Sequence, residues 1–203
     1  MFSDTYLTIA SLAGSSFHDR GSKFLGYAFP VKNEGGVREH LQQLRKQHHD
    51  ATHVCHAYVL GATKNIAYAS DDGEPNNTAG RPIQRVIMRS GLTNVAVFVV
   101  RYYGGTQLGI PGLINAYNTC ATDTLKTAKT IEKTLEETYL AISSYQHENE
   151  VFKLLKQEGA SIGQILKQEE LHITFAIRRS KADQLCNQLL KIPQLLVTFV
   201  GSM

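Results

Sequence analysis

One run of apolar residues limits the folds that are open to this chain. Residues 95–100 are six consecutive apolar side chains, and Arg101 follows them directly. Because apolar and polar residues do not alternate in this run, we expect a β-strand that is buried on both faces of its sheet. Six residues are also far too few to cross a bilayer as a helix. The sequence therefore predicts a sheet covered on both sides, and we expect no membrane partner.

The composition is that of a globular protein with room for two domains. Of the 203 residues, 42% are hydrophobic and 19% are charged, which excludes disordered and collagen-like chains. The formal net charge of +3 is unevenly distributed, because residues 1–135 carry a net charge of +4 and the remainder a net charge of −1. A polyanionic partner should therefore prefer the first part of the chain.

The cysteines and the first residues predict a cytoplasmic protein. Cys55, Cys120 and Cys186 are widely spaced and odd in number, so they suggest neither a disulfide framework nor a structural zinc site. Residues 1–14 lack a basic segment followed by a long apolar run, so we expect no signal peptide.

The first part of the chain reads as alternating strands and helices. Strands are expected at residues 6–13, 23–31, 54–60, 66–70 and 95–100, with the first two paired and the next two joined in a hairpin. Helices are expected at residues 37–44, 83–89 and 113–128, where apolar residues recur every three or four positions. Gly91 should end the second helix, and Pro111 should start the third.

The second part of the chain follows the order β-α-β-β-α-β. Strands are expected at residues 139–143, 162–168, 171–177 and 195–200, and helices at 148–158 and 181–191. Gly159 should end the first of these helices, and Ser180 with Asp183 should form a capping box for the second. This order is that of the ferredoxin-like fold. With a boundary in the polar stretch 127–137, the sequence predicts an α+β protein of two domains, residues 1–134 and 135–203.

An acidic loop precedes the second helix. Residues 70–75 read Ser-Asp-Asp-Gly-Glu-Pro, with carboxylates at Asp71, Asp72 and Glu74. In a functional interpretation, these groups bind a hard cation or act as acid and base. In a structural interpretation, they bond to turn amides and pair with Arg81 or Arg101, while Thr78 caps the helix. Because the spacing is not that of an EF-hand, the residues alone favour the structural interpretation.

A glycine-rich segment follows the buried strand. Residues 101–112 read Arg-Tyr-Tyr-Gly-Gly-Thr-Gln-Leu-Gly-Ile-Pro-Gly. The segment is not a Walker loop, because Ile110 and Pro111 stand where that motif has Lys and Ser or Thr. One interpretation is a tight crossover from strand to helix. The other is polyanion contact, with Arg101 on a phosphate and the adjacent tyrosines on bases.

Four histidines and one cysteine lie within nine residues, at positions 48, 49, 53, 55 and 56. On a strand, His53 and Cys55 share one face and His56 points to the other, so a single tetrahedral metal site would need distortion or further ligands. A hydrolase that uses Cys55 as its nucleophile has no better support, because spacing alone orients no partner for the thiol. We therefore expect core or turn residues here, and neither a metal site nor catalytic residues.

Several motifs together resemble one protein family. They are Ser-Lys-Phe at residues 22–24, Ala-Thr-His-Val-Cys-His-Ala-Tyr at 51–58, the signature from Ser70 to Pro82, and Val-Val-Arg-Tyr-Tyr-Gly-Gly with Leu-Gly in residues 99–109. In this order they resemble the IMPACT family, in its bacterial YigZ-like branch, over about the first 130 residues. The remainder is similar to that branch by its length and its order of elements.

The resemblance implies a fold and a set of site residues. The first domain should have the ribosomal-protein-type β-α fold also found in domain IV of elongation factor G, and the second should be similar to the ferredoxin-like domain V of that factor. The phosphate or nucleic-acid contacts would be Lys23, Arg81, Arg101, Tyr102, Gly104, Gly105 and Gly109. The signature acidic loop would be shaped by Ser70, Asp71, Asp72, Glu74 and Thr78.

Three functions follow from these expectations. The leading one is a non-enzymatic cytoplasmic protein that binds RNA or the ribosome, is linked to the regulation of translation and needs no cofactor, while its second domain contacts a protein. The alternative is a divalent-cation-dependent enzyme, or a binder of a phosphorylated small molecule, that uses the acidic loop and the glycine-rich turn. In the third, the protein is an interaction module whose signature residues stabilise the fold.

Overall fold

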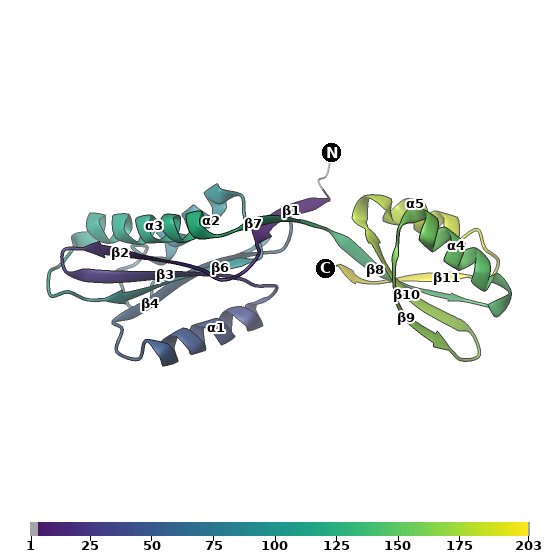
Figure 1. Ribbon diagram of the computed structural model, residues 1–203, viewed down its shortest axis with the longest axis horizontal. Helices are drawn as coiled ribbons and strands as arrows, with labels where there is room; N and C mark the ends of the chain where they lie inside the picture. The colour runs from purple at the N-terminus through teal and green to yellow at the C-terminus, as the bar shows by residue number, and fades with distance from the viewer. Residues whose placement is uncertain (1–3, 203) are drawn as a thin grey trace. The chain divides into compact units, whose positions relative to one another are not determined.

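The computed structural model describes residues 4–202 and divides the chain into two compact units (Figure 1). One unit is Tyr6–Lys133, and the other is formed by the chain from Thr134 onward together with Asp4 and Thr5. The protein is an α+β protein in which each unit has its own antiparallel sheet. Among residues 4–202, no helix is both long enough and apolar enough to span a membrane.

The first unit is built on a five-stranded sheet in the order β2-β3-β6-β4-β5. Its strands are β2 (Ala13–Asp19), β3 (Ser22–Pro30), β4 (His53–Leu60), β5 (Ile66–Ser70) and β6 (Val95–Tyr102). All of the pairings in it are antiparallel. The apolar run lies in the central strand β6, where every residue from Val95 to Arg101 is buried.

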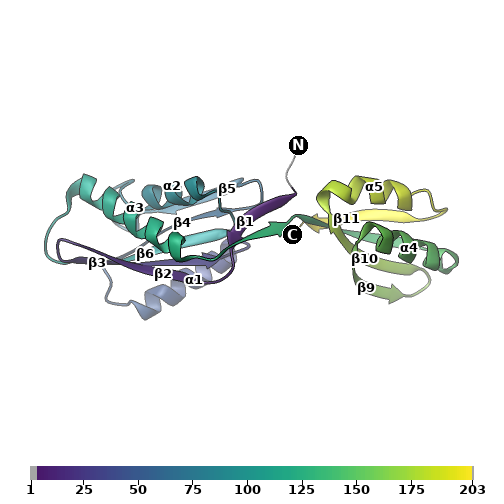
Figure 2. The same ribbon diagram turned by 45° about the horizontal axis from the view of Figure 1, so that its top comes forward.

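Helices cover both faces of this sheet, as the buried run predicts. Figures 1 and 2 show α2 (Gly80–Ser90) and α3 (Gly109–Thr127) on one face and α1 (Glu34–Gln47) on the other. Two apolar clusters result, because successive side chains of a strand point to opposite faces. Val97 and Val99 pack under α2 and α3, whereas Phe98 and Val100 pack under α1.

The predicted pairing of residues 6–13 with 23–31 is wrong. Residues 13–19 form β2, and this strand is the partner of β3. β1 (Thr5–Ile9) instead pairs with β7 (Thr130–Thr134), which lies inside the stretch expected to be a polar boundary. Small polar residues suit β2 because it is an edge strand of the sheet. One of them, Ser15, forms a hydrogen bond with Thr124 of α3, with an oxygen-to-oxygen distance of 2.7 Å.

The second unit shows the predicted β-α-β-β-α-β order. Its elements are β8 (Glu136–Ser143), the short 3-10 helix η1 (Tyr145–His147), α4 (Glu148–Glu158), β9 (Ser161–Lys167), β10 (Leu171–Arg178), α5 (Arg179–Leu189) and β11 (Leu196–Ser202). The sheet order β11-β8-β10-β9 places the first and third strands of the unit at its centre. The alternating buried residues of β10, from Leu171 to Ile177, pack against α4 and α5.

The predictions for helix ends are confirmed for two helices and wrong for two others. Gly91 and Gly159 end their helices in the left-handed conformation that glycine adopts at low cost, as predicted. The predicted capping box at Ser180 is wrong, because α5 begins at Arg179 and its N-cap residue, Arg178, makes no side-chain cap. The third helix begins at Gly109, which leaves Pro111 inside its first turn rather than at its start.

Candidate functional site

The signature segments meet around a buried ion pair. Nη1 of Arg101 on β6 donates to Oε1 of Glu74 at 2.6 Å, and the hydroxyl of Tyr117 on α3 donates to the same oxygen at 2.8 Å. Both charged side chains are almost fully buried, with exposed fractions of 6% and 3%. The guanidinium also lies over the rings of Phe24 and Tyr103, at 5.5 and 5.4 Å from their centroids. A buried charge needs such a partner, so the pair fixes the acidic loop against the sheet.

Asp71 caps the helix that follows the acidic loop. Its carboxylate accepts hydrogen bonds from the backbone amides of Asn77, Ala79 and Gly80, at 2.8 to 2.9 Å. A negative charge at the amino end of a helix is stabilised by the unpaired amides and by the helix dipole. Thr78 does not cap α2, contrary to the prediction, because its hydroxyl donates to the carbonyl of Pro75 at 2.6 Å.

Asp72 joins the loop to the opposite face of the sheet. Its Oδ1 accepts from Nη2 of Arg45 on α1 at 2.5 Å, and its Oδ2 accepts from the amide of Val54 at 2.7 Å. Within residues 4–202, none of the three carboxylates pairs with Arg81, which is exposed in the first turn of α2. The contacts of the loop are therefore those of the structural interpretation, with Arg45 as the partner that the sequence did not suggest.

The glycine-rich segment is held close to the turn between β2 and β3. A Cβ atom on Gly104 would lie 1.9 Å from the backbone carbon of Gly21, so only glycine fits there. The amide of Gly104 donates to Oγ of Ser22 at 3.2 Å, and Nη2 of Arg20 donates to the carbonyl of Leu108 at 2.9 Å. Gly104 thus makes room for another part of the protein backbone, whereas Gly105 and Gly109 have positive φ angles of 84° and 70°.

A pocket of about 530 Å³ opens beside this segment. Its charged and polar lining comes from Thr52, His53, Glu74, Arg101 and Gln107, and its remaining wall from Pro75, Tyr103, Leu108, Gly109, Ile110 and Leu113. Nε of Arg101 is buried and has no hydrogen-bond partner among the described residues. We call this cavity the glycine-loop pocket.

His53 and Cys55 have different roles in the site. Nδ1 of His53 lies 2.8 Å from the carbonyl oxygen of Asp72 and therefore carries the proton, which leaves Nε2 at 3.9 Å from Oε1 of Glu74. Sγ of Cys55 is buried and lies within hydrogen-bond distance of two acceptors for its single proton, the carbonyl oxygen of Asp71 at 3.0 Å and the Tyr117 hydroxyl at 3.3 Å. Burial strongly raises the pKa of this thiol, so it is a core residue rather than an activated nucleophile.

The predicted phosphate contacts lie on two faces of the sheet. Lys23 and Tyr102 are register partners on β3 and β6, on the face that α1 covers. Arg101 lies on the other face, beneath the glycine-loop pocket. Tyr102 is a hydrogen-bond partner of His48 and Asp50, whereas its exposed neighbour Tyr103 lines the pocket. The structure therefore does not bring all of these residues to one surface.

Three further residues belong to the site without having been predicted there. Arg20 holds the glycine-rich segment, Tyr117 completes the buried ion pair, and Arg45 binds Asp72. They lie 88, 43 and 27 residues from their partners in the sequence. A single-sequence pattern carries no signal for contacts of that separation, because each depends on how strands and helices are arranged.

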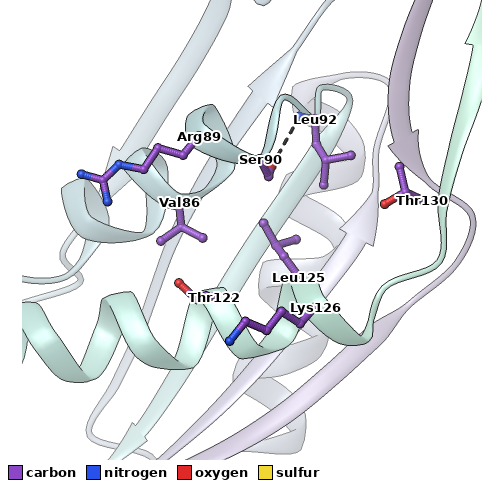
Figure 3. Close-up of a pocket in the computed structure, with 8 residues that line it drawn as sticks. All are labelled: Val86, Arg89, Ser90, Leu92, Thr122, Leu125, Lys126 and Thr130. Atoms are coloured by element: carbon purple, nitrogen blue, oxygen red, sulfur yellow. Dashed lines mark hydrogen bonds between the residues drawn. The ribbon is translucent and has the colours of Figure 1, made fainter.

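A second pocket contains no residue of the signature motifs. It has a volume of about 410 Å³ and is lined by Val86, Arg89, Ser90, Leu92, Thr122, Leu125, Lys126 and Thr130 (Figure 3). The dashed line in Figure 3 joins the Leu92 amide to Oγ of Ser90, at 3.4 Å. Arg89 is exposed there and provides a control position for charge substitutions.

Comparisons with known proteins agree with the arrangement of these motifs. Residues 20–125 match the family model described as the Impact N-terminal domain. The chain is 36% identical over 131 residues to the IMPACT family member YvyE of Bacillus subtilis, a match that covers 64% of this chain and 60% of that protein. It is 34% identical over 139 residues to YigZ of Escherichia coli, with 67% of this chain and 68% of YigZ covered.

The fold has a solved counterpart along its whole length. A crystal structure titled as that of an hypothetical protein matches with a TM-score of 0.77 and 27% identity, over 98% of this chain and 99% of that chain. The family model alone spans more than half of the sequence, including the ion pair and the glycine-rich segment. The chain therefore belongs to the IMPACT family.

Proposed function

We propose that this IMPACT-family protein binds RNA, on the ribosome or free, as part of the regulation of translation, and that it does so without catalysis. The likeness to domains IV and V of elongation factor G that the family resemblance implies supports an RNA-facing role for the two units. The net charge of +4 over residues 1–135 supports the first unit as the one that meets the polyanion.

One observation carries this proposal. The turn between β2 and β3 and the glycine-rich segment are bonded to one another at one end of the sheet, through Gly104 and Arg20. This contact brings the exposed cations Arg20 and Lys23 to the end of the sheet at which Tyr103 lies, with Lys23 on the α1 face and the half-exposed Tyr103 ring in the glycine-loop pocket. We call this the tip surface. Exposed cations and an exposed aromatic ring at one end of a sheet suit a nucleic acid, because phosphates and bases can then be contacted at the same end.

The state of the acidic loop supports a binding role over an enzymatic one. The carboxylates of Asp71, Asp72 and Glu74 are each engaged by amides, an arginine or a tyrosine of the same protein. The cysteine nearest to them is buried, with a raised pKa. We infer that these groups stabilise the site through contacts within the protein and do not act on a substrate.

The test is co-sedimentation with ribosomes and ribosomal subunits over a series of salt concentrations. Lys23→Ala should weaken binding and lower the slope of log affinity against log salt by about one, because one phosphate contact is lost. Tyr103→Ala should weaken binding without changing that slope. Arg89→Ala, which removes an exposed arginine far along α2, should change neither. Absence of binding by the native protein at low salt contradicts the proposal.

A second candidate function is the binding of a phosphorylated small molecule in the glycine-loop pocket. The buried Arg101 lines that pocket with an Nε that has no partner among the described residues, beside the start of α3, where the N-cap residue Leu108 makes no side-chain cap. Because the loop carboxylates already have partners, this candidate needs no divalent cation. Thermal unfolding with inorganic phosphate and with nucleotides distinguishes it, since a ligand that binds only the native state raises the Tm, and the stabilisation grows with the logarithm of one plus the ratio of its concentration to Kd.

A further inference from the structure

A groove rich in aromatic side chains lies apart from both the tip surface and the glycine-loop pocket. It has a volume of about 350 Å³ and runs between α1 and the hairpin of β4 and β5, on the sheet face opposite α2 and α3. The side chains that matter here are His56 and Tyr58 on β4, Tyr68 on β5, and Arg38 and Arg45 on α1. We call it the aromatic groove.

The rings in the groove form a preorganised stacking surface. Tyr58 is buried and stacks on Tyr68, with ring centroids 5.5 Å apart and planes 23° apart. His56 is stacked on Phe98 at 5.4 Å and lies 5.9 Å from the Tyr68 ring. Tyr68 itself is 49% exposed on the edge strand of the sheet. It is therefore an open aromatic face that buried rings hold in place.

Charged groups flank these rings. The side chains of Arg38 and Arg45 are 72% and 54% exposed, although each has a carboxylate partner, Glu34 at 4.0 Å and Asp72 at 2.5 Å. Burial lowers the pKa of His56, so this ring is neutral at pH 7. Its Nδ1 has no hydrogen-bond partner among the described residues. The groove thus combines an open ring, a neutral imidazole and two cations that solvent reaches.

We propose that the aromatic groove holds one unstacked base of single-stranded RNA, stacked on Tyr68, with the neighbouring phosphates on Arg38 and Arg45. Aromatic side chains bind unpaired bases of any sequence, because every base has a π face, and arginines beside them follow the backbone. The inference rests on the proposed RNA-binding function and adds a second contact to the tip surface. Loss of one stacked base lowers affinity by about 10-fold.

Photochemical cross-linking of the full chain tests this assignment. The probe is a decamer of uridine that contains one 4-thiouridine, and mass spectrometry locates the labelled residue. We expect the label on Tyr68, and an affinity about 10-fold lower for Tyr68→Leu with loss of the label. Tyr68→Phe should keep the affinity of the native protein, since the ring remains. Tyr145→Leu changes an exposed tyrosine of the other unit and should have no effect.

The outcomes separate this inference from the function on which it rests. If the native protein binds the decamer and Lys23→Ala weakens binding, but Tyr68 stays unlabelled and Tyr68→Leu binds normally, the groove assignment is overturned and RNA binding stands. The groove would then belong to another partner, such as an extended protein segment on the open edge of β5. If the native protein does not bind the decamer at low salt but co-sediments with ribosomes, the groove assignment is overturned and the proposed function stands; if it binds neither, both are overturned.

Discussion

At the scale of single residues, burial decides what the charged groups of the signature do. Arg101 follows six apolar residues and was expected to contact phosphate, yet its guanidinium is buried between two rings and bonded to Glu74. Two charges in such a place stabilise one another, and either alone would be costly. The pair is therefore a structural requirement of the site, whatever the ligand.

Removal of one charge should show how much the pair of Arg101 and Glu74 contributes to the free energy of unfolding. In Glu74→Gln, an oxygen acceptor remains for Arg101 and Tyr117 but the buried cation loses its counter-charge. We expect the free energy of unfolding, measured in urea, to fall by about 3–5 kcal/mol. Asp123→Asn breaks the exposed pair with Lys126 and should cost less than about 1 kcal/mol. Equal losses in both variants would show that the Glu74 pair is not buried in solution.

His56 should contribute a pH dependence to stability. Burial lowers its pKa from the ordinary value of 6.5, so the unfolded chain binds the proton more readily than the folded protein does. Stability is then fully present above pH 6.5 and falls as the pH is lowered through the folded pKa, by at most about 1.4 kcal/mol per pH unit. His56→Phe should flatten this decline in urea unfolding measured between pH 7 and pH 5. If stability declines as steeply in this variant as in the native protein, the pH dependence arises from groups other than His56.

At the scale of elements, a side chain from a preceding loop replaces the missing cap of a helix. The residue before α2 is Ala79, which has no side chain able to bond to the helix amides. Asp71, eight residues earlier, supplies the carboxylate that accepts from Ala79 and Gly80. Gly80 in turn lies so close to the backbone of Ser70 that a Cβ atom would be 2.6 Å from its nitrogen. The acidic loop therefore supplies both the cap and a close backbone contact at the start of α2.

Asp71→Ala should therefore weaken the start of α2. Three amides lose their acceptor, and we expect a loss of about 2 kcal/mol, near the upper end for a helix cap. Hydrogen exchange should accelerate first at Ala79 and Gly80, while the end of the helix at Gly91 is unaffected. If exchange at the two amides is unchanged, Asp71 does not cap α2 in solution.

At the scale of the whole molecule, each unit has a core of its own. In the first unit, buried residues pack on both faces of the five-stranded sheet. In the second, Phe175 and its neighbours on β10 pack against α4 and α5, and the Phe175 ring stacks on Tyr139 at 5.7 Å. Separate cores predict that damage to one unit leaves the other folded.

Phe175→Ala tests this independence. A cavity in the second core should cost that unit about 3–5 kcal/mol. Amides of β8 and β10 should then exchange faster, while those of β3 and β6 keep their protection. Ile87→Ala should give the converse result, because Ile87 is buried in the first core. Parallel loss of protection in both units would mean that they unfold as one.

Most of the elements and their order could be predicted from sequence, although β2 and β7 were not expected. The run at residues 95–100 predicted the central covered strand, the apolar spacing predicted five helices, and Gly91 and Gly159 ended theirs where expected. The signature motifs also contain most of the residues that meet at the buried ion pair and the glycine-rich segment. These features depend on residues a few positions apart, which a linear pattern records.

Which groups meet depends on the packing of the folded chain. This packing paired β2 rather than β1 with β3, bonded Glu74 to Arg101, and placed Lys23 and Arg101 on opposite faces of one sheet. It also brought Tyr68 onto Tyr58 in the aromatic groove. Such contacts depend on strand register and on which helix covers which face. Both result from packing the whole chain around its cores, so neither is set by local sequence.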